Sequence, residues 1–316
     1  HHSRDTARQR TSKTSRTDVT TTGQPFMTES VATSKSAWER PQRGAYVTYI
    51  VAAFGQMLLL TLRRQRIVLA AIITMLPVLV PLSMAFLSPS QFAEDGAKVF
   101  TNTAEHVHIN MLAPLLALFF AAMLVGEEVE SQTIAYMLTR PMPRSAWVLG
   151  RFLAYFLVTS SILVASCALT FSACTALDKL SFAWEHVKLL LHYCGVSVFA
   201  LAAYGALAAF LGATTRRPIV IGVIVLYGWQ RIALLVPGIV DFLTIQKYTD
   251  ALLPALATQR LNVEIQTVLG TFQKEIFLVG AGKAGIALGI IIVAFLAATT
   301  LAVRIREYSS ARAIGG

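Results

Sequence analysis

Carboxylates and guanidinium groups gather between two long apolar runs in the middle of the chain. The segment EEVESQTIAYMLTRPMPRSAW, residues 127–147, opens with Glu127, Glu128 and Glu130 and ends with two prolines followed by Arg144. Charged side chains of this kind can pair with one another or offer a binding surface to another protein. They are costly to bury at a membrane unless they are paired. A short turn would be enough to join the two apolar runs, so the length and the charge of this segment need another explanation.

The local pattern of this segment predicts a short amphipathic helix over residues 127–140. Its glutamates fall in the first turn, where carboxylates interact favourably with the positive end of the helix dipole. Ile134, Met137 and Leu138 follow at helical spacing and form an apolar stripe. The helix should end before Pro141, because the residue preceding a proline disfavours α geometry. We therefore expect a helix parallel to the membrane, charged on one side and apolar on the other.

Two arginines follow this segment at a spacing of seven residues. Arg144 and Arg151 then share a helix face at the start of the next apolar run. Arg151 lies about two turns into the run and is expected to extend its guanidinium back toward the polar end. Glu127 or Glu128 is a plausible partner for these cations. On this pattern alone, a charged loop that only fixes topology explains the segment equally well.

Sequence motifs for catalysis are not found in the chain. The stretch VGAGKAG, residues 279–285, is not a phosphate-binding loop, because Lys283 is followed by Ala284 and no glycine stands five residues before Gly282. There is no HExxH motif, no catalytic triad pattern and no paired-carboxylate site. We therefore expect no enzyme, no bound cofactor and no metal in this chain.

The composition places the chain in the membrane. Of its 316 residues, 55% are hydrophobic and 14% are charged, and the mean hydropathy is +0.60. Such a sequence has too little charge to cover a soluble surface. The formal net charge is +10, but the basic residues cluster at the ends of apolar runs, which disfavours a nucleic-acid partner. The fold class expected is an all-α membrane protein, because helices satisfy their own backbone hydrogen bonds in lipid.

Six apolar runs are long enough to cross a bilayer, at residues 67–87, 109–126, 147–173, 188–213, 218–239 and 276–303. Residues 1–45 are rich in Ser, Thr and Arg and are predicted to be a disordered tail, which leaves 46–316 as the transmembrane domain. The run 46–62 has the lowest spanning length and is separated from the next run by only four residues. We interpret it as a helix lying in the membrane interface, with a seventh span as the alternative.

The linkers between the runs alternate in charge. One set contains Arg63, Arg64 and Arg66, then Arg140 and Arg144, and later arginines at 216, 217, 304, 306 and 312. The other set contains scattered basic residues diluted by acids. The arginine-rich set should face the cytoplasm. Both termini then lie inside, in agreement with an even number of spans.

The last outer connection, about 240–275, shows apolar residues at helical spacing and is predicted to form one or two short helices, with a plain solvated loop as the alternative. Small residues recur every fourth position in two spans, at Ala208 and Gly212 and at Ala281, Gly285 and Gly289. This spacing lets helices approach closely in lipid, so it predicts a compact bundle or a dimer face.

Candidates for a transport pathway lie near the fifth predicted span. Arg231 lies past its midpoint and can pair with Asp241, bind an anionic substrate or form an outer gate with Trp229. A purely structural pairing within the bundle explains it as well. His106 and His108 form a His-x-His pair that could bind copper or zinc, but no Cys or Met is spaced around them, so we favour a solvated outer loop over a metal site.

The run GEEVESQTIAYMLTRPMPRSAWVLGRFLAY, residues 126–155, resembles the signature of ABC-2 type transporter permeases. The matching positions are Glu127, Glu128, Thr133, Leu138, Thr139, Pro141, Arg144 and Arg151. Gln132 stands where the family has a glycine, and Arg151 stands where lysine is commoner. The remaining layout, over 46–316, is also similar to that family.

This resemblance implies a permease subunit of an ABC exporter in the bacterial inner membrane. It implies that 127–140 is a coupling helix docking on a separate ATPase subunit, which binds ATP and Mg²⁺. It also implies that two such membrane domains, copies or paralogues, surround one pathway for a substrate that the sequence leaves open. The alternative from another functional class is an ATP-independent carrier or a membrane scaffold.

Overall fold

The computed structural model describes residues 43–62, 64–87, 96–124, 143–178, 184–215, 217–229, 232–233, 242–253, 262–267, 270–275 and 279–305. Pro41–Gly316 forms one compact unit, separate from His1–Arg40. The predicted disordered tail therefore lies outside the described residues, apart from positions 43–45, which begin the first helix.

The described part of this unit is mainly helical. Its elements are α1 (Arg43–Thr61), α2 (Arg64–Leu87), α4 (Gly96–Thr103), η1 (Ala104–Leu112), α5 (Ala113–Leu116), η2 (Ala117–Ala121), α8 (Arg144–Asp178), α9 (Trp184–Thr214), α10 (Pro218–Val223), η3 (Ile224–Trp229), α12 (Ile245–Ala251), β1 (Asn262–Thr267), β2 (Gly270–Glu275) and α13 (Ala281–Ile305). Here η marks a π-helix. Five helical stretches among the described residues are long and apolar enough to cross a membrane: 64–83, 96–121, 144–175, 186–214 and 281–305.

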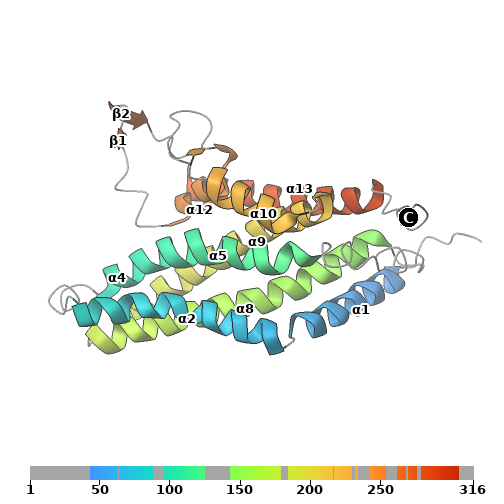
Figure 1. Cartoon of the computed structure of the whole chain (residues 1–316), viewed down its shortest axis with the longest axis horizontal. Helices are drawn as coiled ribbons and strands as arrows, with labels where there is room; N and C mark the ends of the chain where they lie inside the picture. Colours follow the sequence, from blue (N-terminus) through green and yellow to red (C-terminus); the bar gives the residue numbers. More distant parts are fainter. Residues whose placement is uncertain are drawn as a thin grey trace, which may run out of the picture. The chain divides into compact units, whose positions relative to one another are not determined.

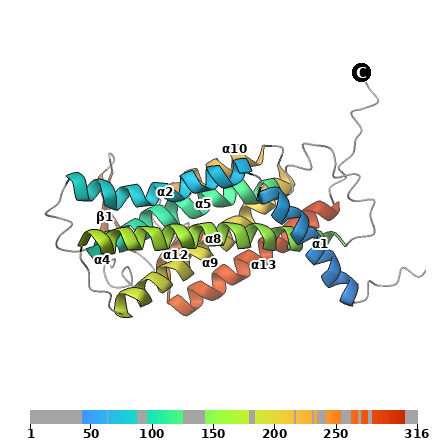
Figure 2. The same ribbon diagram turned by 90° about the horizontal axis from the view of Figure 1, so that it is seen from below.

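Helices α8 and α9 form the centre of this unit. Helices α1 and α2 follow one another along α8, as both ribbon views show (Figures 1 and 2). Helix α9 runs between α8 on one side and α13 on the other, and it also contacts α5 and η2. The core is built from small and aromatic side chains of these helices, such as Tyr155, Ala203 and Tyr204. Small residues allow the close helix contacts that lipid-embedded bundles need.

Four of the five spanning stretches confirm predicted spans with shifts of a few residues, and the second predicted span is corrected. It begins at Gly96, thirteen residues before the predicted start at 109. Polar residues hid this extension, but Phe100, Thr103 and Ala104 lie on one buried face. The predicted solvated loop at His106 and His108 is therefore wrong, although His106 itself is exposed.

This second spanning stretch changes its hydrogen-bond pattern around a proline. Pro114 has no N–H, and its ring clashes with the carbonyl four residues earlier in a regular α-helix. The neighbouring Ala113 N–H bonds to the His108 carbonyl, five residues back. Tyr227 Oη of η3 donates to the Met111 carbonyl at 2.8 Å. This bond ties the two π-helical segments η1 and η3 together.

The fifth predicted span, 218–239, is helical over Pro218–Trp229 and again at positions 232–233. The described part is shorter than a bilayer crossing, and positions 230–231 and 234–241 lie outside the described residues. This fifth predicted span, and with it the total of six spans, therefore stays a prediction. Helix α1 confirms the predicted helix at 46–62. Its placement in the membrane interface stays a prediction too.

The outer connection differs from the prediction. Helix α12 supplies one short helix, but β1 and β2 form an antiparallel hairpin, with Asn262 opposite Glu275 and Thr267 opposite Gly270. The helical prediction for this connection is therefore wrong over 262–267 and 270–275, which are strands. Val263 and Ile265 alternate with polar residues in β1, and this period of two favours a strand.

Candidate functional site

The predicted coupling segment leads directly into α8. Most of its candidate residues lie outside the described part of the chain: Glu127, Glu128, Glu130, Thr133, Leu138, Thr139 and Pro141. Arg144 and Arg151 are described. The first described residue after the segment is Pro143, which directly precedes the first turn of α8, the longest described helix.

Arg144 joins the start of α8 to the end of α13. Its Nη1 donates to the Val303 carbonyl at 3.3 Å and to the Arg304 carbonyl at 2.7 Å. The last carbonyls of a helix have no partner within that helix, and they carry the negative end of its dipole. A guanidinium at this position both satisfies these carbonyls and neutralises the dipole. Two helix ends 160 residues apart in sequence are thereby linked.

Helix α1 also packs on this first part of α8. Tyr46 Oη donates to Ser145 Oγ at 3.1 Å. One turn further, Gly150 faces the backbone of α1, so that an added Cβ would lie 2.8 Å from the Ala53 Cβ and 3.1 Å from the Phe54 nitrogen. Only a glycine allows this approach. The first two turns of α8 therefore contact both α1 and α13.

Arg151 directs its guanidinium back over Trp147, one turn nearer the start of α8, and the side chain is buried inside the protein. It is 1% exposed, and its guanidinium carbon lies 4.7 Å from the ring centroid of Trp147. A cation over an indole face is stabilised by the ring quadrupole. Burying a charge is costly, so its position needs good compensation. The predicted partners Glu127 and Glu128 lie outside the described residues.

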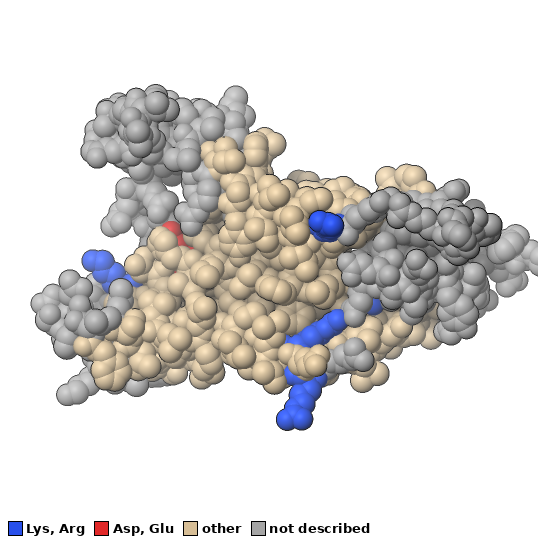
Figure 3. Space-filling view, viewed as in Figure 1, with Lys and Arg blue, Asp and Glu red and all other residues tan. Residues whose placement is uncertain are grey.

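The structure agrees with the alternation of charge along the sequence. Because Arg144 bonds to the carbonyl of Arg304, the start of α8 and the end of α13 lie at one end of the bundle, here called the Arg end. Helices α4, α9 and α13 begin at the opposite end, which carries Lys98, Lys188 and Lys283 and is called the Lys end. In the view of Figure 3 the described surface is largely uncharged, with a few Lys and Arg side chains and one small acidic area.

The candidate gate is only partly described. Trp229 ends η3 and is 39% exposed. Arg231 and Asp241 lie outside the described residues. Their predicted pairing and their role in a pathway stay predictions.

One comparison decides the family. Residues 59–228, more than half of the chain, match the family model described as ABC-2 family transporter protein. The chain belongs to the ABC-2 transporter family. Among curated proteins, none matches the chain. The family and the five spanning helices together make this a multi-pass membrane permease of an ABC-type transporter.

The matched region of the permease includes a polar contact that the sequence did not predict. His108 of η1 is fully buried, and its Nε2 lies 3.2 Å from Ser166 Oγ of α8. Ser166 in turn donates its single hydroxyl proton to the Thr74 carbonyl of α2 at 2.9 Å. The hydroxyl must therefore accept from His108, so Nε2 carries the imidazole proton. Three spanning helices are connected by this chain of bonds.

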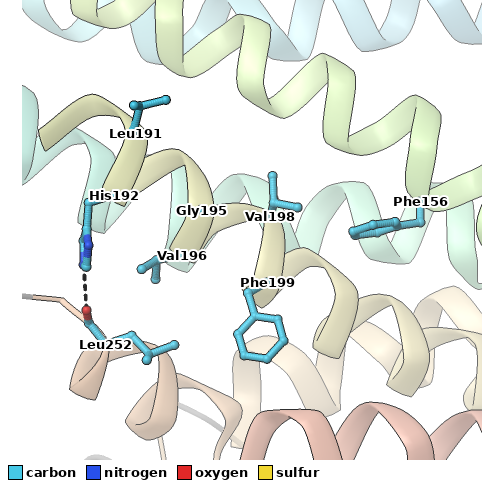
Figure 4. Close-up of a pocket in the computed structure, with 8 residues that line it drawn as sticks. All are labelled: Phe156, Leu191, His192, Gly195, Val196, Val198, Phe199 and Leu252. Carbon is cyan, nitrogen blue, oxygen red and sulfur yellow. Dashed lines mark hydrogen bonds between the residues drawn. The ribbon is translucent and has the colours of Figure 1, made fainter. Parts of the chain in front are cut away.

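A groove opens on the side of the permease between α8, α9 and α12. It has a volume of about 520 Å³ and is lined by apolar side chains, with His192 as the one titratable group (Figure 4). His192 Nε2 donates to the Leu252 carbonyl at 2.9 Å, which fastens the end of α12 to α9. The described residues hold no group of three His, Cys, Asp or Glu side chains placed to bind a metal ion.

Proposed function

We propose that this permease is the membrane subunit of an ABC exporter, and that a separate ATPase subunit moves it by pushing on the segment 127–140. Membership of the ABC-2 family supports this proposal. So does the position of the segment, which leads into Arg144. ATP and Mg²⁺ bind to the partner subunit, and the Arg end with both termini faces the cytoplasm of a bacterial inner membrane.

The observation that carries the proposal is the set of bonds at the start of α8. A displacement of the segment reaches Arg144 first. Arg144 holds the end of α13, and its neighbour Ser145 holds Tyr46 of α1. Because an α-helix is stiff along its axis, α8 transmits this displacement along its length to Ser166, which is bonded to α2. One push then reorients several spans together, which is what alternating access requires.

A second copy or a paralogue of the permease completes the exporter in this proposal. Helix α13 supports it, because its side chains Ile286, Ile290 and Val293 are largely exposed and Gly289 has open space beside it. Small and branched residues on one helix face suit close helix pairing in lipid.

The coupling role is tested with the tagged full-length chain, purified together with the ATPase that accompanies it. Glu128→Lys should reduce the stimulation of ATP hydrolysis by the permease about tenfold or more, because it reverses a charge at the docking surface. The matched control is Glu264→Lys in β1, which reverses a charge in the outer connection and should leave stimulation unchanged. Equal stimulation in all three proteins would contradict the coupling role.

A second arm tests the transmission step. Arg144→Ala should leave the ATPase bound but lower its stimulation, because α13 is no longer held at the start of α8. Arg217→Ala removes an exposed arginine before α10 and serves as the control. Purification without any ATPase, with transport that survives ATP depletion, would instead support an ATP-independent carrier.

A further inference from the structure

The groove between α8, α9 and α12 lies at a definite depth in the membrane. The spanning stretch of α9 runs from 186 to 214, so its midpoint is Ala200. The lining residues of α9 begin at Leu191, near the Lys end, and finish at Phe199, beside this midpoint. At ~1.5 Å per residue the lined stretch is about 12 Å long. Half of a hydrocarbon core measures about 15 Å, so the groove covers the depth of one leaflet.

The groove is lined mainly by apolar side chains, and one lining position is a glycine without a side chain. Phe156 of α8 and Phe199 of α9 bound its inner end (Figure 4). Between them and Leu191 stands Gly195, which has no atom within 4 Å of the position that a Cβ would take. The glycine therefore leaves space that no other part of the described chain fills. A volume of about 520 Å³ falls within the range of ~300–1,000 Å³ found for ligand sites.

Cationic side chains stand where the groove meets the membrane surface. Lys188 is exposed and lies one helical turn before His192 on the same face of α9. Lys247 of α12 has its ammonium 3.9 Å from the ring centroid of Phe242. The same short helix carries one carboxylate, Asp250, which balances Lys247, so the excess positive charge among these three groups comes from Lys188 of α9. A positive rim above an apolar slot complements a phosphate joined to a hydrocarbon chain.

We propose that this groove binds a phospholipid from the leaflet at the Lys end, with one acyl chain along Gly195 and its phosphate beside Lys188. His192 acts as a positioning residue: by donating to the Leu252 carbonyl it keeps α12 over the mouth of the groove. The bound lipid contacts α8, α9 and the end of α12, and so stabilises their packing in this half of the bilayer. The proposal depends on the membrane placement of α9 and is independent of the ATPase.

The test places the full-length permease in vesicles of phosphatidylcholine that contain a small fraction of phosphatidylglycerol with a diazirine in its acyl chain. Illumination followed by peptide mass spectrometry should show adducts concentrated on 191–199 and on Leu252. Adducts spread evenly over the exposed faces of α2, α9 and α13 would overturn the proposal, whatever the variants show.

Two glycine variants separate a filled groove from a general change of surface. Gly195→Leu fills open space and should reduce the groove adducts about tenfold, which corresponds to ~1.4 kcal/mol of binding. Gly289→Leu adds the same side chain to a glycine of α13 that also has no neighbour within 4 Å, and should leave them unchanged. Equal adduct yields in wild type and Gly195→Leu would refute acyl-chain binding. Cross-links between two copies, formed by a photoreactive amino acid placed within 191–199, would identify a second protein chain as the occupant and also refute it.

A surface variant tests the headgroup contact without altering the core. Lys188→Glu should lower the yield from the phosphatidylglycerol probe about fivefold, the equivalent of ~1 kcal/mol for one cation near an anionic lipid. The yield from a phosphatidylcholine probe with the same diazirine chain should change less, because its headgroup carries no net charge. An unchanged yield with both probes would contradict the phosphate contact, because both headgroups carry the phosphate. Monodisperse elution of each variant in detergent confirms that it is folded.

Discussion

Helices α9 and α13 both carry small residues at every fourth position, but they use them in opposite ways. In α9 an added Cβ on Gly212 would collide with the carbonyl oxygen of Ala122, so this glycine is a contact point between two spans. In α13 neither Gly285 nor Gly289 has any atom within 4 Å of that position. The same spacing therefore indicates only that a close approach is possible. It does not indicate whether the approaching helix belongs to the same chain.

The difference follows from position in the bundle. Helix α9 contacts α8, α13, α5 and η2. Within its most apolar stretch of 18 residues, 67% is buried. For α13 the corresponding share is 17%. In lipid an uncovered apolar face carries little penalty, because lipid tails are as apolar as the side chains. A peripheral helix can therefore keep a packing motif that this chain itself does not cover. Replacing glycines by alanine at matched positions tests this comparison.

The largest effect is expected for Gly212→Ala. The new methyl group meets the backbone of Ala122, which cannot move without displacing a whole span. Overpacking of this kind costs about 3 kcal/mol or more and outweighs the ~1 kcal/mol that alanine gains over glycine in a helix. We expect little folded protein in size-exclusion chromatography of the detergent extract. A wild-type elution profile and melting temperature would show that α9 does not pack as described.

Gly205→Ala should have a smaller effect on the same helix. Its Cβ would lie 2.6 Å from the ring of Tyr155, which is a side chain and can shift more easily than backbone. Tyr155 Oη also donates to the Leu201 carbonyl at 3.4 Å, and a shift weakens this bond. We expect a net loss of ~1–2 kcal/mol of stability, measured as a lower thermal midpoint in detergent. The double variant with Tyr155→Phe should recover little, because the ring carbons remain in the way.

Arg144→Ala tests how the peripheral helix is attached. It removes two charge-assisted hydrogen bonds to the last turn of α13 and leaves the carbonyls of Val303 and Arg304 without this donor. Such bonds contribute ~1 kcal/mol each at a partly exposed site. We expect α13 to fray, seen as faster hydrogen exchange of amides 300–305, while α9 exchanges as in the wild type. Arg144→Lys should restore part of the protection.

The smallest effect is expected for Gly289→Ala in a single permease chain. The methyl group enters open space, and alanine is the better helix former, so stability should change by less than ~1 kcal/mol and in the favourable direction. In the assembled exporter, the same variant also tests whether a second copy covers the exposed glycines of α13. If a second copy packs on α13, cross-linking between copies should fall while the thermal midpoint stays. Destabilisation as large as that of Gly212→Ala would break the comparison.

Much of the fold could be predicted because the bilayer imposes simple rules on a sequence. Apolar runs of sufficient length identified four spans to within a few residues. The motif at 126–155 indicated the family that the match over 59–228 then confirmed. The second span was predicted too short because Lys98, Glu105 and His108 interrupt its apolar pattern. In the bundle, two of these, Glu105 and His108, are buried against neighbouring helices, and a window of hydropathy contains no information about neighbours.

The candidate site was predictable to a similar degree. The spacing of Arg144 and Arg151 correctly placed both at the start of a long helix, but only the fold separated their environments. One guanidinium caps α13 and the other lies over Trp147 inside the protein. The hairpin of β1 and β2 was missed because its apolar residues also fit a helical period over so short a stretch. Short segments with mixed patterns depend on their surroundings.

The amino-acid sequence alone determined that this chain crosses a membrane several times, which of the linkers between its spans are rich in arginine and which family signature it carries. These properties depend on composition and local spacing, and they hold whatever the helices touch. The tertiary structure decided which of two like-spaced small-residue motifs is covered, which arginine is buried and where a groove remains open beside Gly195. Each of these depends on the distance between residues far apart in the chain, and packing alone sets that distance.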